Sequence, residues 1–194
     1  FSKRHDVVFS EILLPDGAND LFLERNHLWN EVERAENRSN SQLCKDFVLA
    51  LPRELDLVHQ IELAKRFART HFVEKGFPAD IAIHDHGDGN PHAHILITTR
   101  RLENNRFSKY KARDLNPVFA KGFVVEQDYW GEQWREMQNE FFIENNLDLQ
   151  VDANHLISER HRGKHHNANA HYLLEENQLI QQARMELIRD NIDL

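Results

Sequence analysis

The feature that most constrains the fold is a histidine-rich turn between two short apolar runs. Residues 84–94 carry four histidines around the stretch Gly-Asp-Gly-Asn-Pro, whose residue types are typical of turns. The flanking runs at 81–83 and 95–97 are rich in isoleucine, which strands favour. The pattern predicts an antiparallel hairpin with strands at about 79–84 and 92–99.

Alternation along these strands brings three of the histidines together. Side chains at i and i+2 share one face of a strand, so His92 and His94 point the same way and Ala93 points to the other face. Residues opposite each other in an antiparallel pair have Cβ atoms roughly 5 Å apart, so His84 falls beside them. Three converging imidazoles favour a divalent-metal site with open coordination positions. Unrelated surface histidines are the alternative, and His86 is predicted to be a solvated turn residue.

Composition is that of an ordinary globular chain. The 194 residues, 40% hydrophobic and 29% charged, suffice for one sizeable core. No apolar run approaches the ~20 residues of a membrane span, so membrane insertion is not expected. The single cysteine, Cys44, excludes an intrachain disulfide and suits a reducing cytoplasm. Phe1 is not a natural start, so we expect the chain to begin inside a longer polypeptide.

The distribution of charge is more informative than its sum. A net charge of −8 argues against nucleic-acid contacts over the whole surface. The segment from Arg100 to Lys121 nevertheless holds seven Lys or Arg against two acidic residues. Because this segment directly follows the strand with His94, we expect it to contact phosphates, and a solvated basic face is the alternative. The expected DNA-binding residues are Arg100, Arg101, Arg106, Lys109, Lys111 and Arg113.

Periodicity over the rest of the chain predicts an α+β fold. Further strands are expected at 5–14, 47–51 and 147–151, and helices at 19–37, 56–75, 128–145 and 172–191. The connection at 100–121 has little periodicity and is expected to be loop. The fold class is α+β, with a largely antiparallel sheet of about five strands, helices on one face and the histidine site on the other. We expect a core domain at 1–151, then a polar, His-rich segment and a C-terminal helix at 152–194.

Glu11 interrupts the apolar run of the first strand and shares a face with Phe9 and Leu13. An ionised carboxylate in such a place is costly unless it reaches solvent or a partner. Metal-bound imidazoles commonly donate their second N–H to a carboxylate. Glu11 is therefore a candidate to orient a metal ligand or to act as a general base. A solvated glutamate at a sheet edge is the alternative.

The stretch Pro91-His92-Ala93-His94, with His84 eight residues before His92, resembles the metal motif of HUH endonucleases. The surrounding sequence resembles, more narrowly, the MobA/MobL (MobQ-type, TraA-like) conjugative relaxases over most of residues 6–160. The stretches that carry this resemblance occur in family order and are 10–15, 50–55, 83–94, 111–117 and 130–135.

The resemblance implies a nickase that cuts one DNA strand at an origin of transfer. In this family a tyrosine attacks the scissile phosphate, which leaves a 5′-phosphotyrosine and a free 3′-hydroxyl, and a His-bound metal ion assists. His84, His92 and His94 match the family's metal triad. Mg²⁺ or Mn²⁺ is the expected working ion, although three imidazoles bind Mn²⁺, Ni²⁺ or Zn²⁺ more strongly than Mg²⁺. The implied partners are single-stranded DNA, relaxosome accessory proteins and a coupling protein.

The chain departs from the family at the nucleophile. Family members place the tyrosine near the N-terminus, in a segment that would precede Phe1, and Tyr110, Tyr129 and Tyr172 have no counterpart. One alternative is an HUH rolling-circle replication initiator with Tyr129 as nucleophile. Another is a metal-stabilised DNA-binding module without nuclease activity in this form. We expect the chain as written to bind oligonucleotides without forming a covalent adduct.

Overall fold

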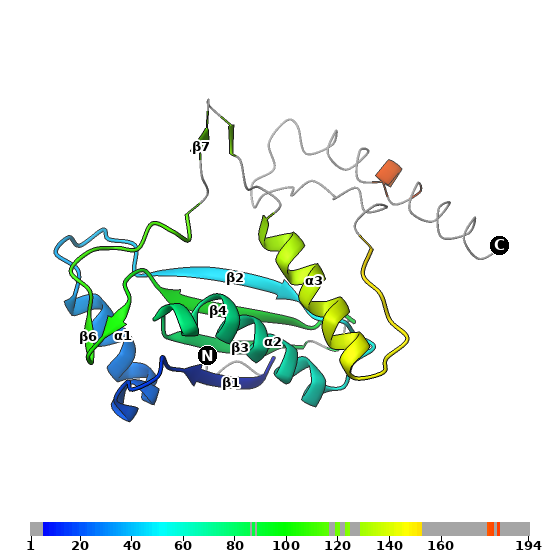
Figure 1. Cartoon of the computed structure of the whole chain (residues 1–194), viewed down its shortest axis with the longest axis horizontal. Helices are drawn as coiled ribbons and strands as arrows, with labels where there is room; N and C mark the ends of the chain where they lie inside the picture. Colours follow the sequence, from blue (N-terminus) through cyan, green and yellow to red (C-terminus); the bar gives the residue numbers. More distant parts are fainter. Residues whose placement is uncertain are drawn as a thin grey trace. The chain divides into compact units, whose positions relative to one another are not determined.

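A four-stranded antiparallel sheet forms the centre of the fold (Figure 1). The computed structural model describes residues 6–85, 87, 89–116, 119–120, 123–124, 129–152, 178–180 and 182. The strands are β1 (Val7–Leu13), β2 (Cys44–Ala50), β3 (Ala79–His84) and β4 (His92–Thr98), in the order β1-β3-β4-β2. The predicted α+β class and antiparallel sheet are confirmed. The sheet has four strands rather than about five, since residues 147–151 form no strand.

The β3–β4 hairpin forms where the sequence predicts it. Its register pairs His84 with His92 and Ala82 with His94. Every residue of β3 is buried, because this strand is central and packed on both sides. In the turn, Gly87 and Gly89 have φ of 71° and 79°, a conformation that glycine adopts without the strain of a Cβ.

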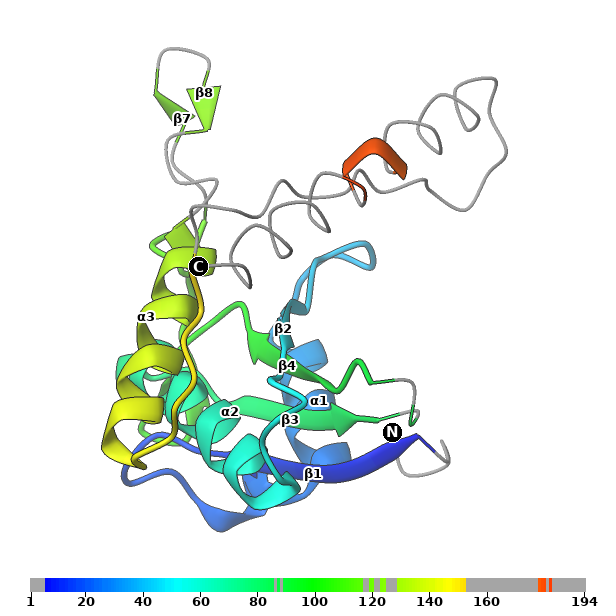
Figure 2. The same ribbon diagram turned by 90° about the vertical axis from the view of Figure 1, so that its right-hand side faces the viewer.

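Two helices cover one face of the sheet (Figure 2). α2 (Leu57–His71) begins after Asp56, whose carboxylate caps the helix by accepting a hydrogen bond from the His59 amide at 2.9 Å. A short 3-10 helix, η2 (Val73–Lys75), follows it. α3 (Tyr129–Glu144) packs beside α2, with ring centroids of Trp134 and Phe67 5.2 Å apart. Trp134 and Phe141 of α3 are therefore part of the core.

α1 (Arg25–Arg34) lies on the opposite face, preceded by the 3-10 helix η1 (Asp20–Leu23). Arg25 Nε and Nη2 each donate to the fully buried Asp80 carboxylate at 2.8 Å, and Trp29 Nε1 donates to it at 2.9 Å. By strand alternation Asp80 shares a face with His84. α1 thus covers the far end of the face that carries the histidines, which corrects the expectation that all helices lie on the other face. It is also shorter than the predicted helix at 19–37.

The segment after β4 contains a hairpin, not only loop. β5 (Leu102–Glu103) pairs with β6 (Arg106–Phe107). The two asparagines between them, Asn104 and Asn105, have φ of 50° and 63°, which suits a two-residue hairpin turn. A second small pair, β7 (Phe119–Ala120) and β8 (Phe123–Val124), follows.

The chain forms two compact units, Phe1–Phe141 and Phe142–Leu194. Most of the second unit, including nearly all of the predicted helix at 172–191, lies outside the described residues. The predicted boundary between residues 151 and 152 therefore stays a prediction. Among the described residues, no helix meets the length and hydropathy of a bilayer-spanning segment.

Candidate metal centre

Three histidines meet where β3 ends and β4 begins. The ring centroids of His84 and His94 are 5.0 Å apart, and His92 lies 5.4 Å from each of them. His84 is 2% exposed, and the other two are half-buried. The structure thus brings together the three side chains that strand alternation predicts. His86 lies outside the described residues.

Each of these imidazoles has an oxygen partner at Nδ1. The pairs are His84 with Asp6 Oδ2 (2.9 Å), His92 with the Asn90 carbonyl oxygen (3.0 Å) and His94 with Asp46 Oδ2 (3.0 Å). An Nδ1–H donated to an oxygen fixes the neutral tautomer whose basic lone pair is on Nε2. The cluster therefore offers three Nε2 donors, the set that Mn²⁺, Zn²⁺ and related ions accept.

The spacing of the rings fits a shared ion. Nε2–metal bonds of about 2.1 Å place the centroids of three ligating rings roughly 5 Å apart, close to the separations of 5.0 and 5.4 Å observed here. In the described part of the chain, no group of three or more His, Cys, Asp or Glu side chains is arranged so that it could hold a metal ion as it stands. For the three imidazoles to share an ion they would have to turn, and χ2 of histidine is a soft torsion.

Glu11 is not one of the residues that orient the histidines. It pairs with Ile81 across β1 and β3, so alternation places it on the face covered by α2. There its Oε2 accepts a hydrogen bond from Lys65 Nζ at 2.6 Å. The expected role of Glu11 beside the metal ligands is corrected accordingly, and its carboxylate instead ties α2 to the sheet.

Two other carboxylates, Asp6 and Asp46, contact the histidines, and the sequence pattern did not predict them. Asp46 lies within β2 opposite Leu96, and its side chain reaches His94 diagonally across the strand pair. It interrupts an apolar strand just as Glu11 does, which is a usable signal. Only the strand order, which puts β2 beside β4, identifies the carboxylate that faces the histidines.

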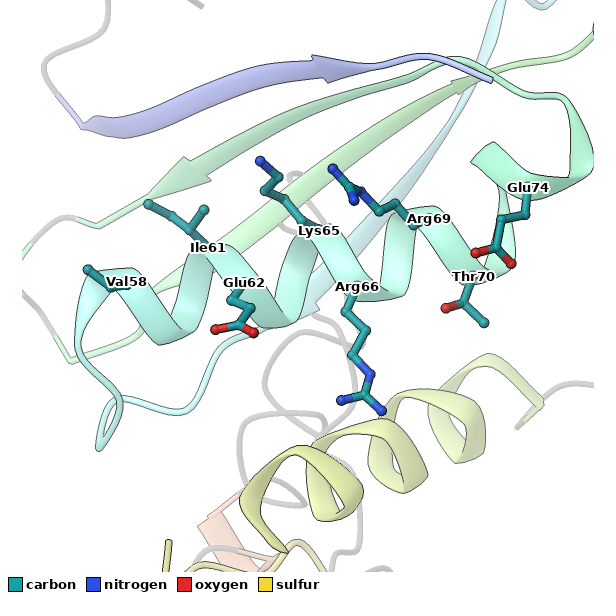
Figure 3. Close-up of a pocket in the computed structure, with 8 residues that line it drawn as sticks. All are labelled: Val58, Ile61, Glu62, Lys65, Arg66, Arg69, Thr70 and Glu74. Atoms are coloured by element: carbon teal, nitrogen blue, oxygen red, sulfur yellow. The ribbon is translucent and has the colours of Figure 1, made fainter. Parts of the chain in front are cut away.

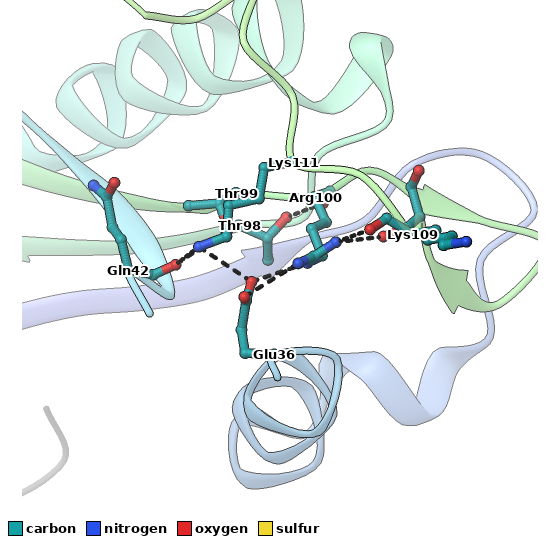
Figure 4. A network of polar contacts seen from close by, with 8 residues as sticks. Glu36, Gln42, Thr98, Thr99, Arg100, Lys109 and Lys111 are labelled. Carbon is teal, nitrogen blue, oxygen red and sulfur yellow. Dashed lines mark hydrogen bonds and ion pairs between the residues drawn. The ribbon is translucent and has the colours of Figure 1, made fainter. Parts of the chain in front are cut away.

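Half of the predicted DNA-binding cations take part in the internal structure. Arg100 and Glu36 form an ion pair with side chains 11% and 4% exposed, at 2.9 Å between Nε and Oε1 (Figure 4). Arg100 also donates to the Ser108 and Lys109 carbonyls. Lys111 Nζ lies 3.3 Å from the same glutamate. These contacts hold the pKa of Glu36 below its usual value, with the Arg100 hydrogen bond as the largest cause.

Arg101 is the third cation with internal partners, and the other three are exposed. Arg101 lies over the Phe77 ring at 4.7 Å and pairs with Asp114 at 2.5 Å. Arg106, Lys109 and Arg113 are exposed and can meet DNA.

The basic segment leaves the end of β4 that is remote from the histidines. His92 opens β4 and Thr98 closes it, and six steps at about 3.3 Å separate them by roughly 20 Å. Figure 1 shows the β5–β6 hairpin and α1 at that remote end of the sheet. The basic segment therefore follows the histidine-bearing strand in the sequence but does not lie beside the histidines in the structure.

The described tyrosines lie away from the histidine cluster. Tyr110 is 73% exposed in the basic segment. Tyr129 opens α3, with its ring centroid 5.1 Å from that of Trp130, and Trp130 packs on Phe47 of β2 at 5.0 Å. Phe47 faces α2 and α3, so Tyr129 belongs to the side of the sheet opposite the histidines. Tyr172 lies outside the described residues.

A separate groove of about 540 Å³ runs along the outer face of α2. Figure 3 shows Lys65 and Arg69 on one side of it and Arg66 pointing toward α3. Two of these cations already have carboxylate partners, since Lys65 pairs with Glu11 and Arg66 lies 3.7 Å from Glu140. The lining residues all come from α2 and η2, so this groove is distinct from the histidine cluster.

Comparison with known proteins assigns the chain to a family. The model of the MobA/MobL family matches residues 1–182. The chain belongs to the MobA/MobL family. This confirms the resemblance drawn from the separated sequence motifs, and the histidine hairpin lies within the matched region.

Relatives within the family are transfer and mobilisation proteins. Conjugal transfer protein TraA of Agrobacterium fabrum is 33% identical over 79% of this chain. Mobilization protein MobL of Acidithiobacillus ferridurans is 26% identical over 72% of it. A chain solved in work on the molecular basis of vancomycin resistance transfer in Staphylococcus aureus is 36% identical, with a TM-score of 0.65, 79% of this chain and 78% of that chain covered.

The match extends over only part of the larger relatives. The chain spans 16% of the length of the Agrobacterium TraA protein and 43% of that of the MobL protein. The region matched by the family model, residues 1–182, contains the sheet and the three histidines.

Proposed function

We propose that this chain contains the metal-dependent DNA-cleaving core of a conjugative relaxase. It would nick one specific DNA strand, bound in single-stranded form, at an origin of transfer. The reaction would take place in the bacterial cytoplasm, with relaxosome accessory proteins and a coupling protein as partners. The observation that carries the proposal is the cluster of three imidazoles with Nδ1 atoms fixed by oxygen partners, within a chain of the MobA/MobL family.

In this proposal the three Nε2 atoms of the cluster hold Mg²⁺ or Mn²⁺. When bound, such an ion neutralises charge on the oxygens of a phosphodiester and makes phosphorus easier to attack. Asp6 and Asp46 hold the orientation of their histidines through the Nδ1 hydrogen bonds, which directs Nε2 toward the ion in this proposal. The rigid β3–β4 hairpin supplies the fixed geometry that such chemistry needs.

The nucleophile of the proposed reaction is a tyrosine from a segment upstream of Phe1, as the resemblance to the relaxases implies. Its phenolate would attack phosphorus and displace the 3′ oxygen, so that the downstream strand becomes attached through its 5′ phosphate. The initiator alternative needs Tyr129 at the metal. The packing of Trp130 on Phe47 places the start of α3 on the other side of the sheet, which argues against it.

A nicking assay tests the proposal. The chain extended by its native upstream segment is incubated with an origin-derived, end-labelled oligonucleotide and Mn²⁺ or Mg²⁺, and products are separated on a denaturing gel. We expect a metal-dependent covalent adduct that is lost in H94A and absent with the 194-residue chain, which should bind the oligonucleotide only. An adduct formed by the 194-residue chain and lost in Y129F would instead establish the initiator reading. Binding without any adduct from the extended chain would favour a DNA-binding module.

A further inference from the structure

The turn between β2 and α2 lies beside the histidine cluster. Ala50, the last residue of β2, pairs with His92. One residue later, the Leu51 amide donates to the Pro91 carbonyl at 2.9 Å. The turn at 52–55 therefore starts next to the residue that precedes a proposed metal ligand.

Hydrogen bonds fix the backbone of this turn. The Leu55 amide donates to the Pro52 carbonyl at 3.2 Å. Gln60 of α2 is buried, and its side-chain Nε2 donates to the backbone carbonyls of both Pro52 and Leu55, at 3.1 Å each. Leu51 and Leu55 are buried on either side. The two residues at the tip, 53 and 54, are thus presented on a rigid support.

The tip presents an exposed cation. The Arg53 side chain is 73% exposed, and its Nε lies 3.3 Å from Glu54 Oε1, on a side chain that is 49% exposed. Such exposed pairs contribute about 0–1 kcal/mol, so a phosphate can replace the glutamate at little cost. Arg100 differs in this respect, because its guanidinium is enclosed with Glu36.

The carboxylates around the histidines repel a DNA strand, so a cation nearby would favour its binding. Asp6 and Asp46 contact the imidazoles, and the exposed Asp85 follows β3 directly. An approaching DNA strand therefore meets carboxylates as well as imidazoles. A guanidinium at the edge of this region offsets that repulsion, and its planar donors match phosphate oxygens in a bidentate manner.

We propose that Arg53 binds a backbone phosphate adjacent to the one that reaches the histidine cluster and so positions the strand for cleavage. This inference rests on the proposed relaxase function. Arg53 follows Leu51 by two residues, at most about 7 Å of chain, and Leu51 is hydrogen-bonded to the neighbour of His92. The turn therefore presents its cation within a short stretch of DNA from the metal centre.

Salt-dependent binding tests the inference. Binding of the 194-residue chain to a fluorescent 20-residue deoxythymidine oligonucleotide is measured by anisotropy over a range of NaCl concentrations, with Mn²⁺ present. We expect R53Q to weaken binding roughly fivefold and to lower the slope of log affinity against log salt by about 0.7, the value for one phosphate contact on a single strand. R53K should keep most of the slope, because it keeps the charge.

R34Q is the matched control. Arg34, on α1, is 71% exposed and also pairs with a neighbouring glutamate, so the variant removes the same charge from a comparable environment. Unchanged affinity and slope in R53Q, or an equal loss in R34Q, would overturn the role of Arg53 while leaving the relaxase proposal intact. Failure of the unmodified chain to bind the oligonucleotide would count against both. Circular dichroism of each variant verifies that the fold is retained.

Discussion

The two ends of β4 use polar side chains in different ways. At the end that opens with His92, three imidazoles face one another, and their Nδ1 atoms are fixed by oxygen partners. At the end that closes with Thr98, Arg100 and Lys111 converge on the enclosed Glu36. The first arrangement orients three imidazoles, the side chains proposed to hold the metal ion. The second uses cations to hold a connecting segment in place.

The difference shows that a local excess of positive charge does not by itself define a DNA-binding surface. Burial decides the role of each cation, because a guanidinium enclosed with a carboxylate has already replaced its water with an internal partner. Arg106, Lys109 and Arg113 remain exposed, but the segment that carries them follows the end of β4 that lies roughly 20 Å from His92. In the proposed reaction they would contact flanking DNA rather than the phosphate that is cleaved.

The largest expected effect is loss of metal binding at the histidine end. H84A, H92A and H94A should each lower Mn²⁺ affinity by roughly a thousandfold, because removal of one of three ligands costs more than the 10–100-fold typical of an outer partner. Isothermal titration calorimetry measures this. H86A and H59A are controls, and His59 is an imidazole with its own carboxylate partner, Asp56, outside the cluster. Loss of binding in H86A with H84A unaffected would show that the ligands are misassigned.

The second effect concerns stability at the basic end. R100Q should lower the free energy of unfolding by about 2 to 3 kcal/mol, since it leaves Glu36 enclosed without its main partner. Urea denaturation followed by circular dichroism measures the change. R106Q, on the exposed side of the same segment, should alter stability by less than about 0.5 kcal/mol. Equal stability of the two variants would refute the structural role of Arg100.

The same ion pair predicts a pH dependence. The pKa of Glu36 is lowered from 4.5 in the folded chain, so its stabilising contribution is fully present above about pH 4.5 and is lost as the pH falls through the folded pKa. Unfolding measured between pH 3 and 6 should show a steeper loss of stability on acidification in the unmodified chain than in E36Q.

A third and smaller effect is expected from the carboxylates beside the histidines. D46N should weaken Mn²⁺ binding about tenfold, because the amide accepts the His94 N–H less strongly than the carboxylate does. E11Q, which changes a carboxylate on the opposite face, is the control and should leave the affinity unchanged. A loss in E11Q as large as that in D46N would contradict the assignment of faces.

The smallest effect is expected from the exposed cations. The triple variant R106Q/K109Q/R113Q should weaken binding of the deoxythymidine oligonucleotide about threefold and reduce its salt dependence. R100Q, assayed under conditions in which it is folded, should bind like the unmodified chain. A larger loss of affinity in R100Q than in the triple variant would mean that Arg100 leaves Glu36 and contacts the DNA itself.

The local part of the site could be predicted from the sequence. Strand periodicity and turn chemistry identify the hairpin, and alternation alone places His84, His92 and His94 on one face. The helix expected at 56–75, observed as α2 (Leu57–His71), is likewise a local feature. These predictions succeed because they involve residues close in the chain, whose geometry depends on backbone preferences rather than on distant partners.

The non-local part could not be predicted in this way. Assigning Asp46 to His94, or Glu11 to Lys65, requires the strand order β1-β3-β4-β2, which periodicity does not contain. The position of α1 on the histidine face depends on Asp80, whose buried carboxylate binds Arg25 and Trp29 across more than fifty residues. The pairing of Arg100 with Glu36 is of the same kind.

The central claim is that His84, His92 and His94 form one metal site. A crystal of the chain soaked in Mn²⁺ tests it most directly through the anomalous signal of manganese. The account predicts one strong peak about 2.1 Å from the Nε2 atoms of all three histidines, with the Nδ1 contacts to Asp6 and Asp46 retained. A peak bound instead by carboxylates elsewhere, or none at the histidines under conditions where titration shows binding, would contradict it.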